Sequence, residues 1–131
     1  MRSPAEILRS SSTIALVGAS PREDRPSHRV LRYLLEAGYR VIPVNPTCEE
    51  VLGIECVPSL AAIHEPVDLV DVFRRPEFCA DVAREAAAVG ATALWLQLGI
   101  VSPEARIVAR ESGMDYVEDA CTLVVHRREL L

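Results

Sequence analysis

The chain has 131 residues, 50% of them hydrophobic, with 14 positive side chains against 19 acidic ones and a net charge of −5. This length suits a single domain over residues 1–131, and a chain of this size buries roughly two-thirds of its unfolded surface without a disulfide or a metal. The acidic balance argues against a general nucleic-acid-binding protein, and the apolar content argues against disorder. Every positive charge is an arginine, because the chain contains no lysine.

The amino terminus and the cysteines predict a cytoplasmic protein. Residues 1–12 lack the basic and apolar regions of a signal peptide, and no apolar run approaches the ~20 residues of a membrane span, so we expect no membrane association. The cysteines form no CxxC pair, which favours neither a zinc site nor a disulfide framework. We interpret them as reduced and mostly buried thiols: Cys48, Cys56, Cys79 and Cys121.

The expected elements of the first half alternate between helices and strands. Ser3 to Glu6 read as a capping box with proline at the first helical position, which predicts a helix. A buried strand is expected at 14–17, a helix beginning at Pro26, and a second strand at 40–44. Pro43 is unfavourable in a strand because it lacks the ladder donor, but it stands near the end. Between 45 and 65 we expect one short helix beginning at Ser59.

The second half repeats this alternation. Strands are expected at 69–73, 93–96 and 114–117, with helices beginning at Pro76 and Pro103. Glycines stand between a helix and the next strand, where a left-handed conformation ends the helix: Gly38, Gly90 and Gly113. The order predicts an α/β fold, a Rossmann-like doubly wound parallel five-stranded sheet with helices on both faces.

Ligands of such sheets bind at the carboxyl ends of the strands, where the strand order reverses. The turn after the first strand, Gly18-Ala19-Ser20, offers a close backbone approach to an anion and the amides of a helix start. Arg22, Arg25 and Arg29 follow, with planar guanidinium groups suited to phosphate. The alternative is that Gly18 only makes a tight turn and the arginines are solvated.

Motifs that are absent bear on the type of phosphate ligand. A dinucleotide fingerprint reads GxGxxG, whereas this turn has a single glycine, and an NAD site has an acid after the second strand where Asn45 and Pro46 stand here. Both absences argue against the interpretation as an NAD(P)-dependent oxidoreductase, but they do not exclude it. There is no P-loop motif, which excludes phosphoryl transfer on that scaffold.

Several segments jointly resemble the small stand-alone CoA-binding proteins, which are similar to the CoA-binding domain of the succinyl-CoA synthetase α subunit. The resemblance covers about residues 14–130 and depends on Gly53 and on segments 17–21, 38–46, 58–60, 67–68, 72–76 and 95–99. Cys121 matches a cysteine near the end. It implies a Rossmann-like fold that binds coenzyme A. The family's arginine before that cysteine is Ala120 here, and the chain has no room for a ligase's phosphohistidine domain.

The resemblance also implies a division of the ligand among residues of this chain. Gly18, Ala19 and Ser20 are expected to face the pyrophosphate. The adenosine side is expected at Asn45, Phe73, Arg74 and Pro76, and the pantetheine side at Gln97 and Gly99. Pro46 is also expected to bind the cofactor.

Other polar residues carry two interpretations each. Cys121 is either the partner of the CoA thiol in a mixed disulfide or an ordinary buried cysteine. His28 either donates to an anion or is a partly solvated helix residue, and His64 and His126 are interpreted as structural or surface residues. Trp95 is expected in the core, and Asp68 and Asp71 do not form a persuasive acid–base pair.

We therefore expect a cytoplasmic protein that binds coenzyme A or an acyl-CoA, without identifiable catalysis and with a homodimer as one expected state. One alternative is an NAD(P)-dependent oxidoreductase on a minimal Rossmann domain. Another is a regulatory or interaction protein that senses acyl-CoA.

Overall fold

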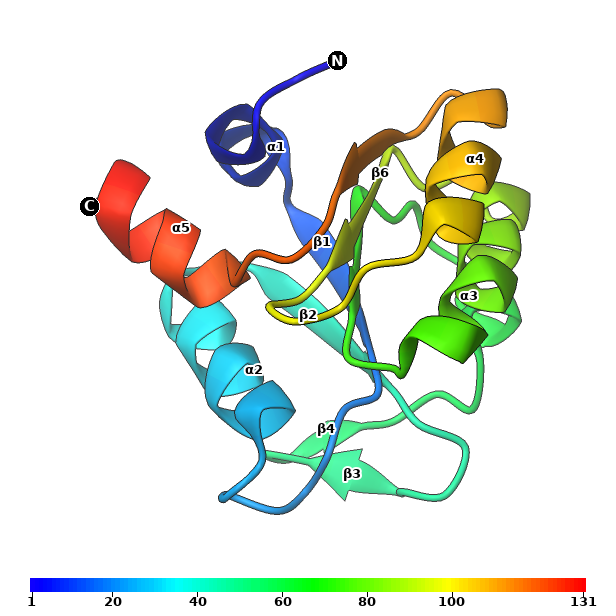
Figure 1. Ribbon diagram of the computed structural model, residues 1–131. Coiled ribbons are helices and arrows are strands. Elements are labelled where there is room, and N and C mark those ends of the chain that lie inside the picture. The colour runs from blue at the N-terminus through cyan, green and yellow to red at the C-terminus, as the bar shows by residue number, and fades with distance from the viewer.

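A computed structural model describes all residues, 1–131, and shows a parallel sheet between two layers of helices (Figure 1). The 5-stranded sheet has the order β2-β1-β5-β6-β7. The strands are β1 (Thr13–Val17), β2 (Arg40–Val44), β5 (Leu69–Val72), β6 (Ala93–Leu96) and β7 (Asp115–Val117). All the expected strands are confirmed, with ends that differ by no more than one residue. The doubly wound α/β fold is confirmed as well.

Helices cover both faces of this sheet. They are α1 (Pro4–Ser10), α2 (Pro26–Glu36), α3 (Pro76–Ala88), α4 (Pro103–Glu111) and α5 (Thr122–Glu129). In Figure 1, α1, α2 and α5 lie on one side of the strands, and α3 and α4 lie on the other. Leu31 and Trp95 belong to the core under the first group, and Val70 and Leu94 to the core under the second. No helix is both long and apolar enough to cross a membrane.

The segment between β2 and β5 contains a hairpin that the sequence analysis did not predict. Its strands are β3 (Glu50–Val51) and β4 (Ile54–Glu55), followed by the expected short helix, which is the 3-10 turn η1 (Leu60–Ala62) with Ser59 as its N-cap. Leu52 and Gly53, between the two strands, both have positive φ, 51° and 78°. Turns of this kind favour Asn or Asp at the first of these positions. Because Leu52 stands there, the sequence carries no recognisable turn signal for this hairpin.

Pro43 fits its strand because β2 is an edge strand of the sheet. Its carbonyl accepts a hydrogen bond from Val57 N at 3.0 Å, on the side away from β1. The donor that proline lacks would point to the same outer side, since the N–H and C=O of one residue share a side in a parallel ladder. The ladder between β1 and β2 is therefore intact.

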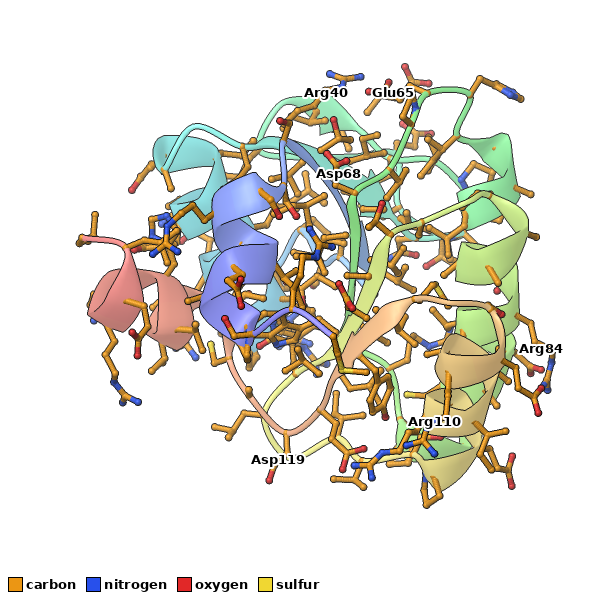
Figure 2. All side chains as sticks on the ribbon, turned by 90° about the horizontal axis from the view of Figure 1, so that it is seen from above. Arg40, Glu65, Asp68, Arg84, Arg110 and Asp119 are labelled. Carbon is orange, nitrogen blue, oxygen red and sulfur yellow. The ribbon has the colours of Figure 1, made fainter.

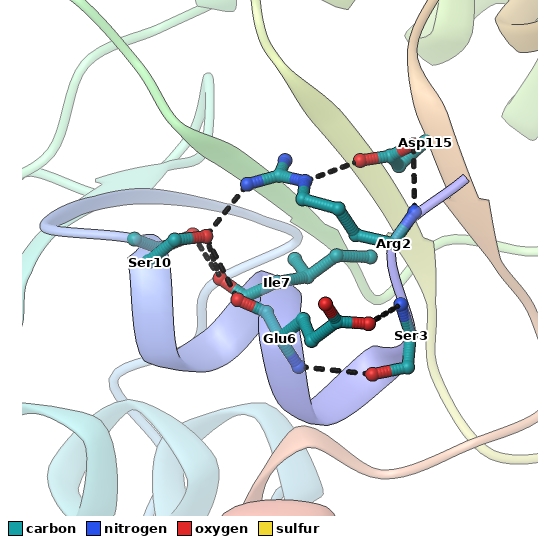
Figure 3. A network of polar contacts seen from close by, with 7 residues as sticks. Arg2, Ser3, Glu6, Ile7, Ser10 and Asp115 are labelled. Carbon is teal, nitrogen blue, oxygen red and sulfur yellow. Dashed lines mark hydrogen bonds and ion pairs between the residues drawn. The ribbon is translucent and has the colours of Figure 1, made fainter.

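Polar contacts attach the amino terminus to the sheet and join segments at the amino-terminal ends of the strands. Arg2 Nε donates to Asp115 Oδ2 at 2.6 Å, which ties α1 to β7, and the capping box of Ser3 and Glu6 is confirmed (Figure 3). Asp68 Oδ2 accepts the backbone N–H groups of Ser12 and Thr13 at 2.9 Å. These hydrogen bonds join the segment before β5 to the start of β1, next to the start of β2, where Arg40 forms its ion pair with Glu65 (Figure 2).

Candidate ligand-binding site at the carboxyl ends of the strands

The strand order reverses between β1 and β5, because β2 lies on one side of β1 and β5 on the other. Sheets of this order bind ligands at that point. Gly18 follows β1, and Phe73 follows β5. A Cβ atom added to Gly18, whose φ is +90°, would lie 2.3 Å from the backbone oxygen of Phe73. Gly18 is therefore required by the contact between the two loops, whatever ligand lies above them.

A cleft of about 760 Å³ opens at this point, between the ends of the strands and helices α2 and α5. It brings together most of the residues expected to bind ligand: Gly18, Ala19, Ser20, Arg22, Arg25, Arg29, Asn45, Phe73, Gln97 and Cys121. The sequence analysis missed its apolar walls, which come from α2, the loop after β6 and α5: Val30, Leu98, Ile100, Leu123 and Val124. We call this space the first cleft.

A second cleft of about 370 Å³ lies on the side of α3. It shares Gly18 and Asn45 with the first cleft and adds the expected residues Pro46 and Arg74. The turn after β1 thus lies between two adjacent clefts. Two expected residues line neither cleft: Pro76 begins α3, and the N–H of Gly99 donates to Asp119 Oδ1 at 2.7 Å.

Two arginines in the first cleft have no carboxylate partner. Arg22 pairs with Asp24 at 2.9 Å, but Arg25 and Arg29 form no ion pair in the structure. Arg25 is also the N-cap of α2, and no side chain caps that helix. The positive end of the helix dipole and two unpaired guanidinium groups therefore face the same space, which favours an anion.

The turn itself is held by buried polar groups. The N–H groups of Gly18 and Ala19 donate to Val44 O at 3.0 and 3.4 Å, which leaves the N–H of Ser20 as the one without a protein acceptor. Asn45 Nδ2 donates to Ala19 O at 2.7 Å. An anion at this turn therefore meets the amide of Ser20 rather than those of the two residues before it.

His28 is buried, so its interpretation as a partly solvated residue is wrong. Its Nδ1 lies 2.9 Å from Ser20 O and therefore carries the hydrogen, while Nε2 lies 3.3 Å from Arg32 Nη2. Because a carbonyl only accepts, this arrangement requires the neutral tautomer with Nδ1–H when Arg32 donates to Nε2. His28 fastens the turn to α2.

At the other end of the first cleft, apolar side chains surround the side-chain amide of Gln97. Gln97 follows β6 and is only 3% exposed, whereas Leu98 and Val124 are 69% and 42% exposed. Gln97 Nε2 donates to Asp71 Oδ1 at 2.6 Å and to Thr122 Oγ1 at 2.8 Å, and Thr122 Oγ1 donates to Asp71 Oδ2 at 3.0 Å. This end of the cleft therefore has a polar floor between apolar walls.

Asp71, for which the sequence indicates no acid–base role, lies inside β5 beneath this floor. Complete burial raises the pKa of its carboxyl from 3.8 to about 7, and the hydrogen bonds from Gln97 and Thr122 act in the opposite direction. The signal that marks it in the sequence is a charged residue inside the apolar run 69–72.

The cysteines differ from expectation, because only Cys79 is buried and the other three are half-buried. The pKa of the Cys56 thiol is raised to about 12, mainly by burial and in addition by the contact with Cys48. Cys121 lines the first cleft as a free thiol. Trp95 is fully buried as expected, and its Nε1 donates to Ala120 O at 2.8 Å.

The sequence profile of the CoA binding domain matches residues 12–127. The chain belongs to this family. An uncharacterized protein of Bacillus subtilis, YneT, is 46% identical over 121 residues, which are 92% of this chain and 90% of the relative. A hypothetical protein from Pyrococcus horikoshii OT3 has 41% identity and a TM-score of 0.95 over 98% of this chain and 90% of its own.

Larger CoA enzymes match over a small part of their length. Acetate–CoA ligase [ADP-forming] I of Archaeoglobus fulgidus is 39% identical over 56 residues, 43% of this chain but 8% of the ligase. The apo form of a dinucleotide-forming acetyl-coenzyme A synthetase 1 of Ca. Korarchaeum cryptofilum has 25% identity and a TM-score of 0.73, over 82% of this chain and 26% of that one. The resemblance to small CoA-binding proteins is confirmed, and it extends to one part of these synthetases.

Proposed function

We propose that this protein binds coenzyme A or an acyl-CoA along the carboxyl ends of its strands. The observation that carries the proposal is the pair of unpaired guanidinium groups, Arg25 and Arg29, in a cleft that opens on an uncapped helix. Membership of the CoA binding domain family supports the same ligand. We attach no catalytic step to this binding.

The two clefts suit the two halves of such a ligand. Phosphates placed near the amide of Ser20 would lie beside Arg25 and Arg29, at the junction of the clefts. The second cleft, with Asn45, Pro46 and Arg74, is the proposed place of the adenosine.

The apolar end of the first cleft is the proposed place of pantetheine. Its walls include Leu98 and Val124, which are exposed in the protein alone and would be covered by the dimethyl group of the arm. Cys121 lies on the same wall, so a thiol or a thioester at the end of the arm would approach it.

Calorimetric titration with coenzyme A, acetyl-CoA and NAD tests the proposal. We expect binding of the CoA compounds and weaker or no binding of NAD, because Asn45 stands where an acid would hold the ribose. Tighter binding of acetyl-CoA than of coenzyme A would favour a sensor of acylation. Tight binding of NAD alone would support the oxidoreductase instead, and no binding of CoA at millimolar concentration would refute the proposal.

Variants that each remove one positive charge then test where the phosphates bind. Arg25→Gln and Arg29→Gln should each weaken CoA binding by roughly tenfold, as expected for a lost charge-assisted hydrogen bond. The control is Arg110→Gln, because Arg110 also lacks a carboxylate partner, but it lies on α4 (Figure 2) and does not line the first cleft. Equal losses in all three variants would indicate a general charge effect and contradict this placement.

A further inference from the structure

The floor of the first cleft rests on a buried carboxylate. Asp71 lies in β5, the middle strand of the sheet, with no exposed surface. No cationic side chain pairs with it, and an uncompensated buried carboxylate is unfavourable unless hydrogen bonds stabilise it. Its two oxygens receive hydrogen bonds from Gln97 and Thr122 at 2.6 and 3.0 Å. These residues therefore form one connected network.

The network determines which way the Gln97 amide faces. Nε2 donates to both Asp71 and Thr122, which uses both of its hydrogens. The hydroxyl of Thr122 donates its own hydrogen to Asp71, so toward Gln97 it accepts. Turning the amide round would place its oxygen against the oxygens of Asp71 and Thr122. When Asp71 is ionised and both of its oxygens accept, one orientation of the amide therefore satisfies the network.

This orientation leaves Gln97 Oε1 without a protein donor. No buried side-chain polar atom in the structure lacks a hydrogen-bond partner, so this oxygen must be accessible to solvent. Gln97 lines the first cleft and is otherwise enclosed. The accessible oxygen therefore faces the cleft and presents a hydrogen-bond acceptor between apolar walls.

We infer that Asp71 is a positioning residue, which holds the Gln97 amide so that Oε1 accepts a hydrogen bond from an N–H or O–H group of the ligand. The inference rests on the proposed function, in which the donors at this end are the amide N–H groups of pantetheine. Through Thr122, the first residue of α5, the same carboxylate ties the α5 wall of the cleft to the β6 wall. Asp71 thus acts on the ligand without touching it.

Two ligands separate this role from a general loss of structure. Coenzyme A contains the pantetheine amides, whereas adenosine 3′,5′-diphosphate lacks them and retains the nucleoside, the 3′-phosphate and one of the two phosphates of the pyrophosphate. Gln97→Met should weaken CoA binding by roughly tenfold, the effect of one lost hydrogen bond in a cleft, and leave the diphosphate unaffected. Calorimetry on folded protein, checked by circular dichroism, measures both affinities.

The variants of Asp71 provide the matched pair. Asp71→Asn keeps an oxygen for Gln97 and offers an amide hydrogen to Thr122, so it should bind CoA nearly as the parent does. Asp71→Val removes the oxygen that accepts from Gln97 and the oxygen that accepts from Thr122. The amide is then free to turn, so this variant should lose roughly tenfold in CoA affinity. Combined with Gln97→Met it should lose no more than Gln97→Met alone, because the two act through one hydrogen bond.

Thr122→Val is a further variant that does not place an apolar side chain in β5. It removes one of the two acceptors of the Gln97 amide, and we expect roughly a threefold loss for CoA and none for the diphosphate.

The outcomes distinguish this inference from the proposed function. Failure of the parent protein to bind either ligand would refute the proposed function. Binding of both ligands with an unchanged ratio in Gln97→Met would refute the hydrogen bond to the arm while leaving CoA binding intact. Equal CoA losses in Asp71→Asn and Asp71→Val would show that the charge of Asp71 acts, rather than its hold on Gln97.

Discussion

Asp71→Asn should change how the free energy of unfolding depends on pH. Burial raises the pKa of the Asp71 carboxyl from 3.8 to about 7 in the folded protein. Since each tenfold change in proton affinity corresponds to about 1.4 kcal/mol, charging this buried group reduces stability by roughly 4 kcal/mol at high pH. The asparagine variant keeps the acceptor for Gln97, donates to Thr122 in place of accepting from it, and has no group to ionise.

The sign follows from the proton count. Below pH ~4 the carboxyl is protonated in both the folded and the unfolded chain, so the raised pKa has no effect on stability. Between pH ~4 and ~7 the unfolded chain releases this proton while the folded chain keeps it, and stability falls as the pH rises. Above the folded pKa the loss is complete. Relative to Asp71→Asn, the parent protein should therefore become progressively less stable over this interval.

Urea denaturation of both proteins at several pH values from 4 to 8 measures this difference (about 4 kcal/mol at most). Glu6 and Glu65 have lowered pKa values from their contacts with Ser3 and Arg40, and they act in the opposite direction. Both proteins contain these two residues, so their contribution cancels in the difference between the two free energies of unfolding at each pH. A difference that stays constant within about 1 kcal/mol would refute the reasoning. A carboxyl-carbon NMR titration of Asp71 reports the same pKa independently.

Three further predictions concern the backbone and a thiol. Gly18→Ala should destabilise by more than ~3 kcal/mol, since its Cβ would collide with Phe73 O, whereas Gly99→Ala, with positive φ but open space, should lose only about 1 kcal/mol in thermal melts. Similar losses in the two variants would contradict the close contact. Leu52→Asn should raise stability by up to about 1 kcal/mol, because asparagine tolerates the left-handed conformation at φ 51°, and an unchanged urea midpoint would argue against strain there. The Cys56 thiol, with a pKa of about 12, should react with iodoacetamide at pH 8 far more slowly in folded than in unfolded protein, as peptide mass spectrometry can measure; equal rates would show that burial does not protect it.

Local signals in the sequence were sufficient for the elements of the sheet. Proline at the first helical position begins α1, α2, α3 and α4, and the apolar runs between them are the strands. Two elements lack such signals: α5 begins without a proline or a side-chain cap, and leucine stands at the left-handed position of the hairpin. Both were missed for that reason, and α5 turned out to form a wall of the first cleft.

By itself, the sequence determined the alternation of strands and helices, the glycine turn after β1 and the group of arginines beside it. These depend on residues close together in the chain, where capping, turn geometry and periodicity act. Only the tertiary structure decided which arginines lack a carboxylate and why Gly18 cannot carry a side chain. It also joined Asp71 to Gln97 and Thr122, which lie 26 and 51 residues away. Crossover connections bring such residues to one edge of a parallel sheet, and no local pattern records which of them meet.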